Sequence, residues 1–434
     1  MATQDQAVTL QVGLFFDGTG NNRGNAVRGE MPHSPEAKGS YASAVSNIAL
    51  LFEAYEVAEP CLALYVEGPG TVEGQDDSDW GWYTGVGETG VRARVEDAAS
   101  RLAGQVSSWL ATRPQLQLQA LQFDLFGFSR GAAGARDFAN DLRKHVDSLL
   151  AKAATRQPVT FAPALGWKDG IDIRFIGLFD TVGAISEPWK LNLIPTNGNY
   201  GELTLAVAPR LARQVVQLVA DHEYRYNYPL VATDNDIRLP GAHADLGGGY
   251  LPVSEERVLL SRSQSCDVPA DADPKSTTAY GEIARLVAGY TDVPGLTPQV
   301  KVWESVGGWL SQGKVVHAAL YRERQVHGHL ARVYLGVMHA LAIRAGVPLG
   351  ELPAAQPWWQ IPADLRAIGN KMRDYALGHT SELGLSKEES DLLQRKYIHT
   401  SANWEPFMGM GNAPTEWVFL NRPAEEGRFV EPNA

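Results

Sequence analysis

The sequence predicts an α/β protein in which a mostly parallel central sheet carries helices on both faces and is interrupted by inserted, lid-like segments. Two observations lead to this fold class. Short apolar runs end at clusters of Gly, Asp or Ser, as buried strands do, and they alternate with longer segments of helical periodicity. Such alternation is typical of parallel sheets, because a crossover helix must return the chain to the edge at which the next strand begins.

The first half of the chain carries the clearest signals. The predicted strands are Val8–Phe16, Leu62–Val66, Leu116–Phe126 and Ile171–Phe179. The predicted helices are Tyr41–Glu56, Val91–Ala111 and Gly131–Leu150. The last of the four strands is apolar almost throughout, which indicates a central strand that is covered on both faces.

The second half is less regular. A helix is expected over Ala208–Tyr224 and a short strand over Asp236–Pro240. Further helices are expected over Tyr280–Tyr290, Val315–Ala345, Ile361–Ala376 and Ser386–Lys396. Residues 185–207 and 251–312 are rich in Pro, Gly, Ser and Trp, and we interpret them as long insertions of the kind that form lids or substrate walls. We therefore expect a single decorated domain over residues 1–434, with its core over about 8–250 and C-terminal elements over 315–420.

Composition excludes several classes of protein. The 434 residues are 44% hydrophobic, which is enough for a sizeable core, and the formal net charge is −12. An acidic balance argues against binding to nucleic acid, which requires a basic surface, and against electrostatic attraction to anionic lipid. Two cysteines exclude a disulfide framework. The first residues carry no Sec signal and no apolar run is long enough to span a bilayer, so we expect a soluble chain made in the cytoplasm.

The stretch Gly127-Phe128-Ser129-Arg130-Gly131 has the Gly-x-Ser-x-Gly pattern of a nucleophile elbow. A predicted strand precedes it and a predicted helix rich in small residues follows it, as the pattern requires. A nucleophilic serine needs a sharp turn to present its hydroxyl above the sheet edge, and the two glycines make room where strand and helix pass closely. The elbow predicts an α/β-hydrolase fold with Ser129 as nucleophile.

The acid and the base of such an enzyme follow the serine in the order Asp or Glu, then His. Asp180 directly follows a predicted strand and is the expected acid. His243 lies in a glycine-rich loop that could bring its ring close to another backbone, and it is the favoured base. His399 remains the rival, because α/β-hydrolases often carry the base near the C-terminus.

An oxyanion hole requires two N–H donors. The expected donors are the backbone of Arg130, directly after the nucleophile, and that of Gly18 or Thr19, in the turn after the first strand. We expect no cofactor and no metal. His243 and Asp245 could in principle bind a metal, but no HExxH motif or Cys/His set accompanies them.

Five blocks occur together in a fixed order: FFDGTGNN, FGFSRGAAGARDFAN, IGLFDTVGA, DHEYRYNYPL and PGAHADLGGGY. Together they resemble the α/β-hydrolase domain of the first family of type VI secretion lipase effectors and of related bacterial hydrolases, over about residues 10–250. The resemblance implies Ser129 as nucleophile, Asp180 as acid and His243, rather than His399, as base.

The resemblance also implies a function. It indicates a phospholipase A that releases an acyl chain from glycerophospholipids, delivered by a type VI secretion system into the periplasm of a rival cell. The implied partners are the ester substrate, a spike component of the secretion system and an immunity protein. Two other functions remain open on the residues alone: a soluble carboxylesterase of small esters, and a non-catalytic binding module on a hydrolase scaffold.

Overall fold

The protein was analysed as a computed structural model. The structure describes residues 6–29, 38–56, 59–78, 87–163, 165–183, 200, 203–290, 293, 295–306, 313–352, 359–406 and 419–433. Most of the expected insertion at 185–207 therefore lies outside the described residues. Within the described ranges, none of the helices combines the length and the apolarity needed to cross a membrane.

The centre of the molecule is a six-stranded parallel sheet with the strand order β2-β1-β3-β4-β5-β7. Its strands are β1 (Gln6–Phe16), β2 (Cys61–Val66), β3 (Leu116–Phe128), β4 (Ile171–Phe179), β5 (Gln214–Ala220) and β7 (Asp236–Leu239). All six run in the same direction, so their carboxyl ends meet at one edge of the sheet. The predicted fold class, a mostly parallel sheet in an α/β protein, is confirmed.

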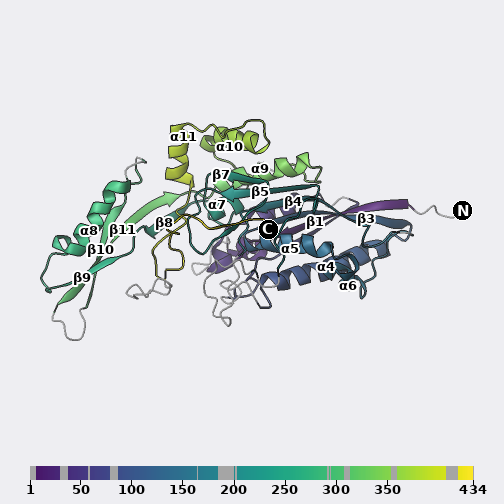
Figure 1. Ribbon diagram of the computed structural model, residues 1–434, viewed down its shortest axis with the longest axis horizontal. Helices are drawn as coiled ribbons and strands as arrows, with labels where there is room; N and C mark the ends of the chain where they lie inside the picture. The colour runs from purple at the N-terminus through teal and green to yellow at the C-terminus, as the bar shows by residue number, and fades with distance from the viewer. Residues whose placement is uncertain are drawn as a thin grey trace.

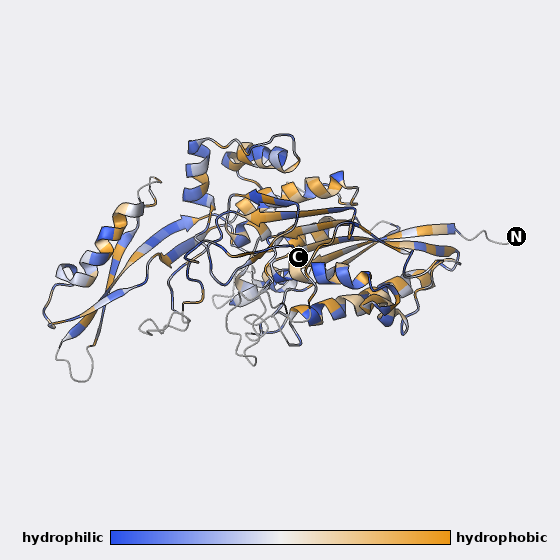
Figure 2. Ribbon diagram, viewed as in Figure 1, coloured by the Kyte–Doolittle hydropathy of each residue, from blue (hydrophilic) through white to orange (hydrophobic). Residues whose placement is uncertain are grey.

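Helices cover both faces of this sheet (Figure 1). One face carries α4 (Val91–Ala111), α5 (Arg130–Leu142) and α6 (Leu149–Ala154), and the other carries α2 (Asn47–Ala54), α9 (Leu330–Arg344) and α10 (Ala363–Ala376). Alternate strand residues enter the two cores, since Leu125 packs into one and Phe126 into the other. The sheet is accordingly the most hydrophobic layer of the molecule (Figure 2).

A second, antiparallel sheet extends away from the first (Figure 1). It consists of β8 (Ser254–Leu259), β9 (Gln264–Val268), β10 (Gln299–Val306) and β11 (Lys314–Val326), and α8 (Thr278–Leu286) packs on it. We call these five elements the arm. Most of the expected insertion at 251–312 thus folds into regular structure. The other α-helices and β-strands of the described residues are α1 (Arg23–Gly29), α7 (His243–Gly247), α11 (Lys387–Leu392), β6 (Leu230–Val231) and β12 (Val430–Glu431).

Two helix predictions were wrong. The segment expected as a helix over Ala208–Tyr224 contains strand β5, which lies between β4 and β7. Its sequence QVVQLVA is buried on both faces, and a fully buried run shows no alternation that would separate a strand from a helix. The single helix expected over Val315–Ala345 is strand β11 followed by α9. Alternate residues of β11, such as Ala318 and Leu320, pack against α8. This spacing of two residues is typical of a strand, and the helix predicted for the segment did not take it into account.

Candidate active site

Ser129 lies between β3 and α5, at the carboxyl edge of the sheet. Its backbone has φ 56° and ψ −126°, a conformation that a non-glycine residue rarely adopts. Its N–H donates to the carbonyl of Phe179 at 3.0 Å, and its own carbonyl accepts from Val182 at 3.3 Å. The strained serine is therefore fixed against the turn that holds Asp180.

The two glycines of the elbow occupy positions where a side chain has no room. A Cβ atom on Gly131 would lie 2.2 Å from the carbonyl oxygen of Asp17, and one on Gly127 would lie 2.5 Å from the Cα of Ala132. The first contact brings the start of α5 against the end of β1. The second brings β3 against the first turn of α5. Both approaches are what the elbow needs to point Ser129 away from the sheet.

Asp180 and His243 form a buried pair. Asp180 follows β4 directly, with φ 46°, and His243 is the first residue of α7. His243 Nδ1 lies 2.5 Å from Asp180 Oδ2, and the imidazole ring packs against Phe128, the residue before the serine, with ring centroids 4.7 Å apart. In the described part of the chain no hydrogen bond joins this ring to the Ser129 hydroxyl. Such a bond commonly tightens only when substrate binds.

Arg428 also contacts Asp180, and sequence reasoning missed it. Its two terminal nitrogens donate to Asp180 Oδ1 at 2.7 Å and to Oδ2 at 2.9 Å. It belongs to residues 419–433, which we call the C-terminal strap. The strap pairs β12 with β6, and Arg428 Nε also donates to the carbonyl of Tyr228 at 2.7 Å. These contacts aim a bidentate guanidinium at the acid from a segment 248 residues away in sequence.

The environment lowers the proton affinity of both members of the buried pair. Burial alone would raise the pKa of Asp180, but the charges of Arg428 and His243 and their hydrogen bonds hold that pKa well below its usual range. Burial lowers the pKa of His243, and the hydrogen bond that its Nδ1–H donates to Asp180 offsets this only in part. Asp180 is therefore ionised and His243 neutral near pH 7, with Nε2 left as a proton acceptor.

The loop after β1 lies beside the elbow. Arg130 Nε donates to Thr19 Oγ1 at 2.6 Å, which joins the loop to the start of α5. Gly18 N–H already donates to Asp17 Oδ1 at 2.8 Å. The Thr19 N–H makes no hydrogen bond within the described residues. Of the two loop donors expected from the sequence, it is therefore the better placed to donate to a bound oxyanion.

The carboxylate of Asp17 anchors this loop through hydrogen bonds. Its buried carboxylate accepts hydrogen bonds from Ser46 Oγ at 2.7 Å and from the Tyr65 hydroxyl at 2.6 Å. Burial raises the pKa of Asp17 to about 6, and the hydrogen bonds from Tyr65, Ser46 and Gly18 limit that rise. The loop conformation therefore depends on a network of buried polar groups that spans three segments of the chain.

The rival base, His399, lies in a different pair. His399 Nδ1 is 2.7 Å from Asp245 Oδ1, and the His399 N–H donates to Asp245 Oδ2 at 3.0 Å. Its ring stacks on Tyr250 with centroids 3.6 Å apart. Asp245 thus bonds His399 and not His243. Across the described residues, no group of three or more His, Cys, Asp or Glu side chains is arranged to hold a metal ion.

Comparison with known proteins identifies the architecture. No protein-family model matches the chain, and no curated protein matches it in sequence. A solved structure, the Tle1 effector bound to the VgrG spike from the type 6 secretion system, matches 98% of this chain and 94% of its own, with a TM-score of 0.75 and 26% identity. The chain has a Tle1-like fold. The resemblance expected from the five ordered blocks is thereby confirmed, and the structural match extends over nearly the whole chain.

A second solved structure is more distant than Tle1. It is an uncharacterized protein from Pseudomonas aeruginosa with 19% identity and a TM-score of 0.41, and the match covers 90% of this chain and 53% of that one. The Tle1 match supports the type VI lipase effector family that the sequence blocks indicate.

Proposed function

We propose that this protein is a serine acyl-ester hydrolase, a phospholipase A that acts as a type VI secretion effector. The observation that carries the proposal is the buried Asp180–His243 pair, which packs against the strand that presents a strained Ser129. The Tle1-like fold supports the lipid substrate and the effector role. The geometry of the pair supports the chemistry independently of that likeness.

In the proposed mechanism, His243 Nε2 removes the proton from the Ser129 hydroxyl as Oγ bonds to the ester carbonyl carbon. The tetrahedral intermediate collapses, the bond to the leaving alcohol breaks, and His243 returns its proton to that oxygen. Water then attacks the acyl-enzyme by the same route. One ester and one water yield one fatty acid and one lysophospholipid, while Asp180 stabilises the imidazolium in both steps.

The oxyanion of each intermediate is assigned to two backbone donors. The first is the N–H of Arg130, at the start of α5, where the helix dipole also favours negative charge. The second is the N–H of Thr19, since that of Gly18 is held by Asp17. The Arg130 side chain keeps the two donors together through its bond to Thr19 Oγ1.

Arg428 is proposed as a positioning residue for Asp180. Its two hydrogen bonds leave the carboxylate one orientation, in which Oδ2 also meets His243 Nδ1. Burial is the main reason that His243 stays a weak base, and the charge of Arg428, which competes with the imidazolium for the carboxylate, acts in the same direction. The expected balance is a neutral, oriented imidazole over a wide pH range.

The relative of known structure supports one of the proposed partners. Tle1 was solved bound to the VgrG spike, and we propose a spike component as the partner of this chain also. An immunity protein in the producing cell, and delivery into the periplasm of the target cell, complete the proposed role.

The test compares fatty-acid release from mixed phospholipid vesicles by the wild-type protein and by folded Ser129→Ala. We expect free fatty acid and lysolipid from the wild type alone. Hydrolysis of short soluble esters without any release from vesicles would replace the phospholipase by a carboxylesterase. Equal fatty-acid release by Ser129→Ala and the wild type would leave the Ser129 mechanism untenable, and no hydrolysis of any ester by either protein would favour a binding module.

A further inference from the structure

A cavity of about 600 Å³ lies at the edge of the sheet opposite to the candidate active site. Ile171, Asp172 and Ile173, at the start of β4, line it, whereas Asp180 follows the end of that strand. At the rise of a β-strand, the two ends are roughly 25 Å apart. Cavities of this size are typical of small-molecule sites. The mechanism proposed above does not use this cavity.

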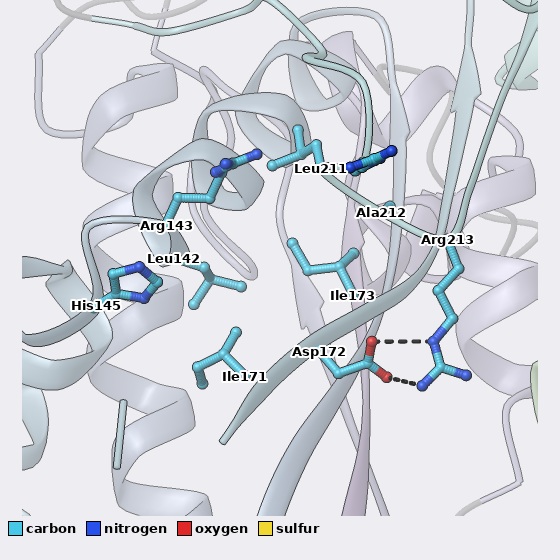
Figure 3. A pocket seen from close by; sticks show the side chains of 10 residues that line it. Leu142, Arg143, His145, Ile171, Asp172, Ile173, Leu211, Ala212 and Arg213 are labelled. Carbon is cyan, nitrogen blue, oxygen red and sulfur yellow. Dashed lines mark hydrogen bonds and ion pairs between the residues drawn. The ribbon is translucent and has the colours of Figure 1, made fainter. Parts of the chain in front are cut away.

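The polar lining of the cavity is mainly basic. It includes Arg143, His145, Arg210 and Arg213 but only one carboxylate, that of Asp172 (Figure 3). This is unusual in a chain whose formal net charge is −12. A cavity with such a lining attracts anions.

The single carboxylate is already neutralised. Asp172 accepts from Arg213 Nε at 3.1 Å and from Arg213 Nη2 at 2.7 Å, and the Gln122 amide donates to it at 2.7 Å. The side chains of Arg143 and Arg210, by contrast, form no ion pair or hydrogen bond with any described residue. Among the described residues, the lining therefore contains two guanidinium groups without an internal counter-ion.

The backbone supplies an independent observation. Within the described ranges, the non-glycine residues with positive φ are Ser129, Asp180, His145 at 53° and Arg210 at 68°. The first two belong to the candidate triad, and the other two both line this cavity. Left-handed backbone at an L-residue costs free energy and is concentrated at catalytic and ligand-binding positions. His145 also has a buried Nδ1 without a hydrogen-bond partner in the described chain.

The rest of the lining is apolar. Leu142, Ile173 and Leu211 are buried side chains that form part of the cavity wall. Figure 3 shows these residues between Arg143 and His145 on one side and Arg213 on the other. A ligand with both an anionic and an apolar part would match this combination.

We propose that this cavity binds an organic phosphate, with Arg143 and Arg210 holding the phosphate group and the apolar wall contacting the organic part. A phosphate monoester is favoured over a carboxylate because it carries up to two charges and three acceptor oxygens, which two guanidinium groups and an imidazole can satisfy. The same chemistry could come from a soluble phosphate ester or from the headgroup of phosphatidic acid.

The test is isothermal titration calorimetry with phenyl phosphate as the probe and octanoate as the carboxylate comparison. Arg143→Gln/Arg210→Gln is measured beside Arg156→Gln/Arg373→Gln, a control that removes two exposed arginines outside the cavity. We expect the wild type and the control to bind phenyl phosphate alike, and the cavity variant to bind it more weakly by on the order of tenfold or more. Thermal unfolding of all variants checks that they fold.

A second experiment identifies the source of the phosphate. Sedimentation with phosphatidylcholine vesicles, with and without phosphatidic acid, is measured in the Ser129→Ala background so that the lipids persist. Binding that requires phosphatidic acid and the two cavity arginines assigns the site to a lipid headgroup, and binding of phenyl phosphate alone assigns it to a soluble ester. Absence of phenyl phosphate binding, equal binding by the cavity variant, or equally tight binding of octanoate would each overturn the proposal.

Discussion

The molecule contains two buried Asp–His pairs that look alike when each is considered alone. Asp180–His243 and Asp245–His399 both join a ring Nδ1 to a carboxylate, at 2.5 and 2.7 Å, and all four side chains are buried. They differ in what surrounds the ring. His243 packs on Phe128, beside the strained Ser129, whereas His399 stacks on Tyr250 and its buried Nε2 has no hydrogen-bond partner among the described residues. Both histidines have a carboxylate partner, so the proposed role of His243 as the base rests on its position beside Ser129.

The second pair has a different task. Asp245 accepts hydrogen bonds from the backbone N–H of Ala242 and of His399 as well as from the His399 ring. Because Ala242 directly precedes His243, this carboxylate ties the start of α7 to the segment around residue 399. We interpret the second pair as the support that holds the first pair in place.

The largest expected effect separates the two histidines. His243→Ala should lower kcat for ester hydrolysis on the order of 10⁵–10⁶-fold, because the proton acceptor is lost. His399→Ala should keep kcat within about tenfold and lower Tm instead, because it leaves the Asp245 carboxylate buried without its ring partner. Steady-state kinetics and thermal unfolding of both variants measure this. A collapse of kcat in folded His399→Ala, with His243→Ala active, would reverse the two assignments.

The next effect separates the two aspartates. Asp180→Asn should lower kcat about 10⁴-fold, because an amide favours the wrong tautomer of the partner histidine. Asp245→Asn should act mainly on stability. The comparison uses kcat at saturating substrate together with urea unfolding of each variant. Similar losses of kcat in both would mean that the two pairs work as one catalytic unit.

A smaller effect concerns pH. His243 must be neutral to accept a proton, and its pKa lies below the ordinary value, so kcat/KM should be constant near pH 7 and fall as the pH drops through that lowered pKa. Arg428→Gln removes a positive charge beside Asp180, which raises the His243 pKa, so this acid limb should move to higher pH. Arg428→Lys should retain most of the wild-type profile. A loss of activity in Arg428→Gln without any shift of the limb would show a purely structural role.

Arg428 also links pH to stability. The folded-state pKa of Asp180 is depressed, so this group contributes stability that is present above its unfolded-state pKa and is lost as the pH falls through the folded value. Arg428→Gln should reduce this contribution, and urea unfolding at pH 7 and at pH 3 measures the difference. An unchanged pH dependence of unfolding would contradict the ionised Asp180.

The smallest effect is expected at Thr19. Thr19→Ala keeps the backbone N–H that we assign to the oxyanion and loses only the hydroxyl that accepts from Arg130, so kcat should fall no more than about tenfold. The matched comparison is His243→Ala on the same ester. A loss of several orders of magnitude in folded Thr19→Ala would show that the hydroxyl itself acts in the reaction.

The sequence predicts the part of the site whose signals are local. The elbow around Ser129 and the apolar run before Asp180 each lie within about ten residues, and strands β3 and β4 were located to within two residues of their ends. The Asp245–His399 pair and the contact between Arg428 and Asp180 were not predicted, because no pattern in the chain marks which distant side chains will meet. Strand β5 was predicted as part of a helix for a different reason. It is buried on both faces, so its sequence lacks the alternation of apolar and polar residues that marks a half-buried strand.

The distance between Arg428 and Asp180 along the chain sets an order of assembly. A ribosome finishes Ser129, Asp180 and His243 well before it reaches the strap, and at ~5–20 residues per second the interval is about ten seconds or more. During that time the acid has no guanidinium to orient it, and β6 has no β12 to pair with. The full orientation of the Asp180 carboxylate should therefore arrive late in translation, after Ser129, Asp180 and His243 have been made. In the proposed role of a phospholipase effector, this delay shortens the time during which the active enzyme meets the lipids of the cell that makes it.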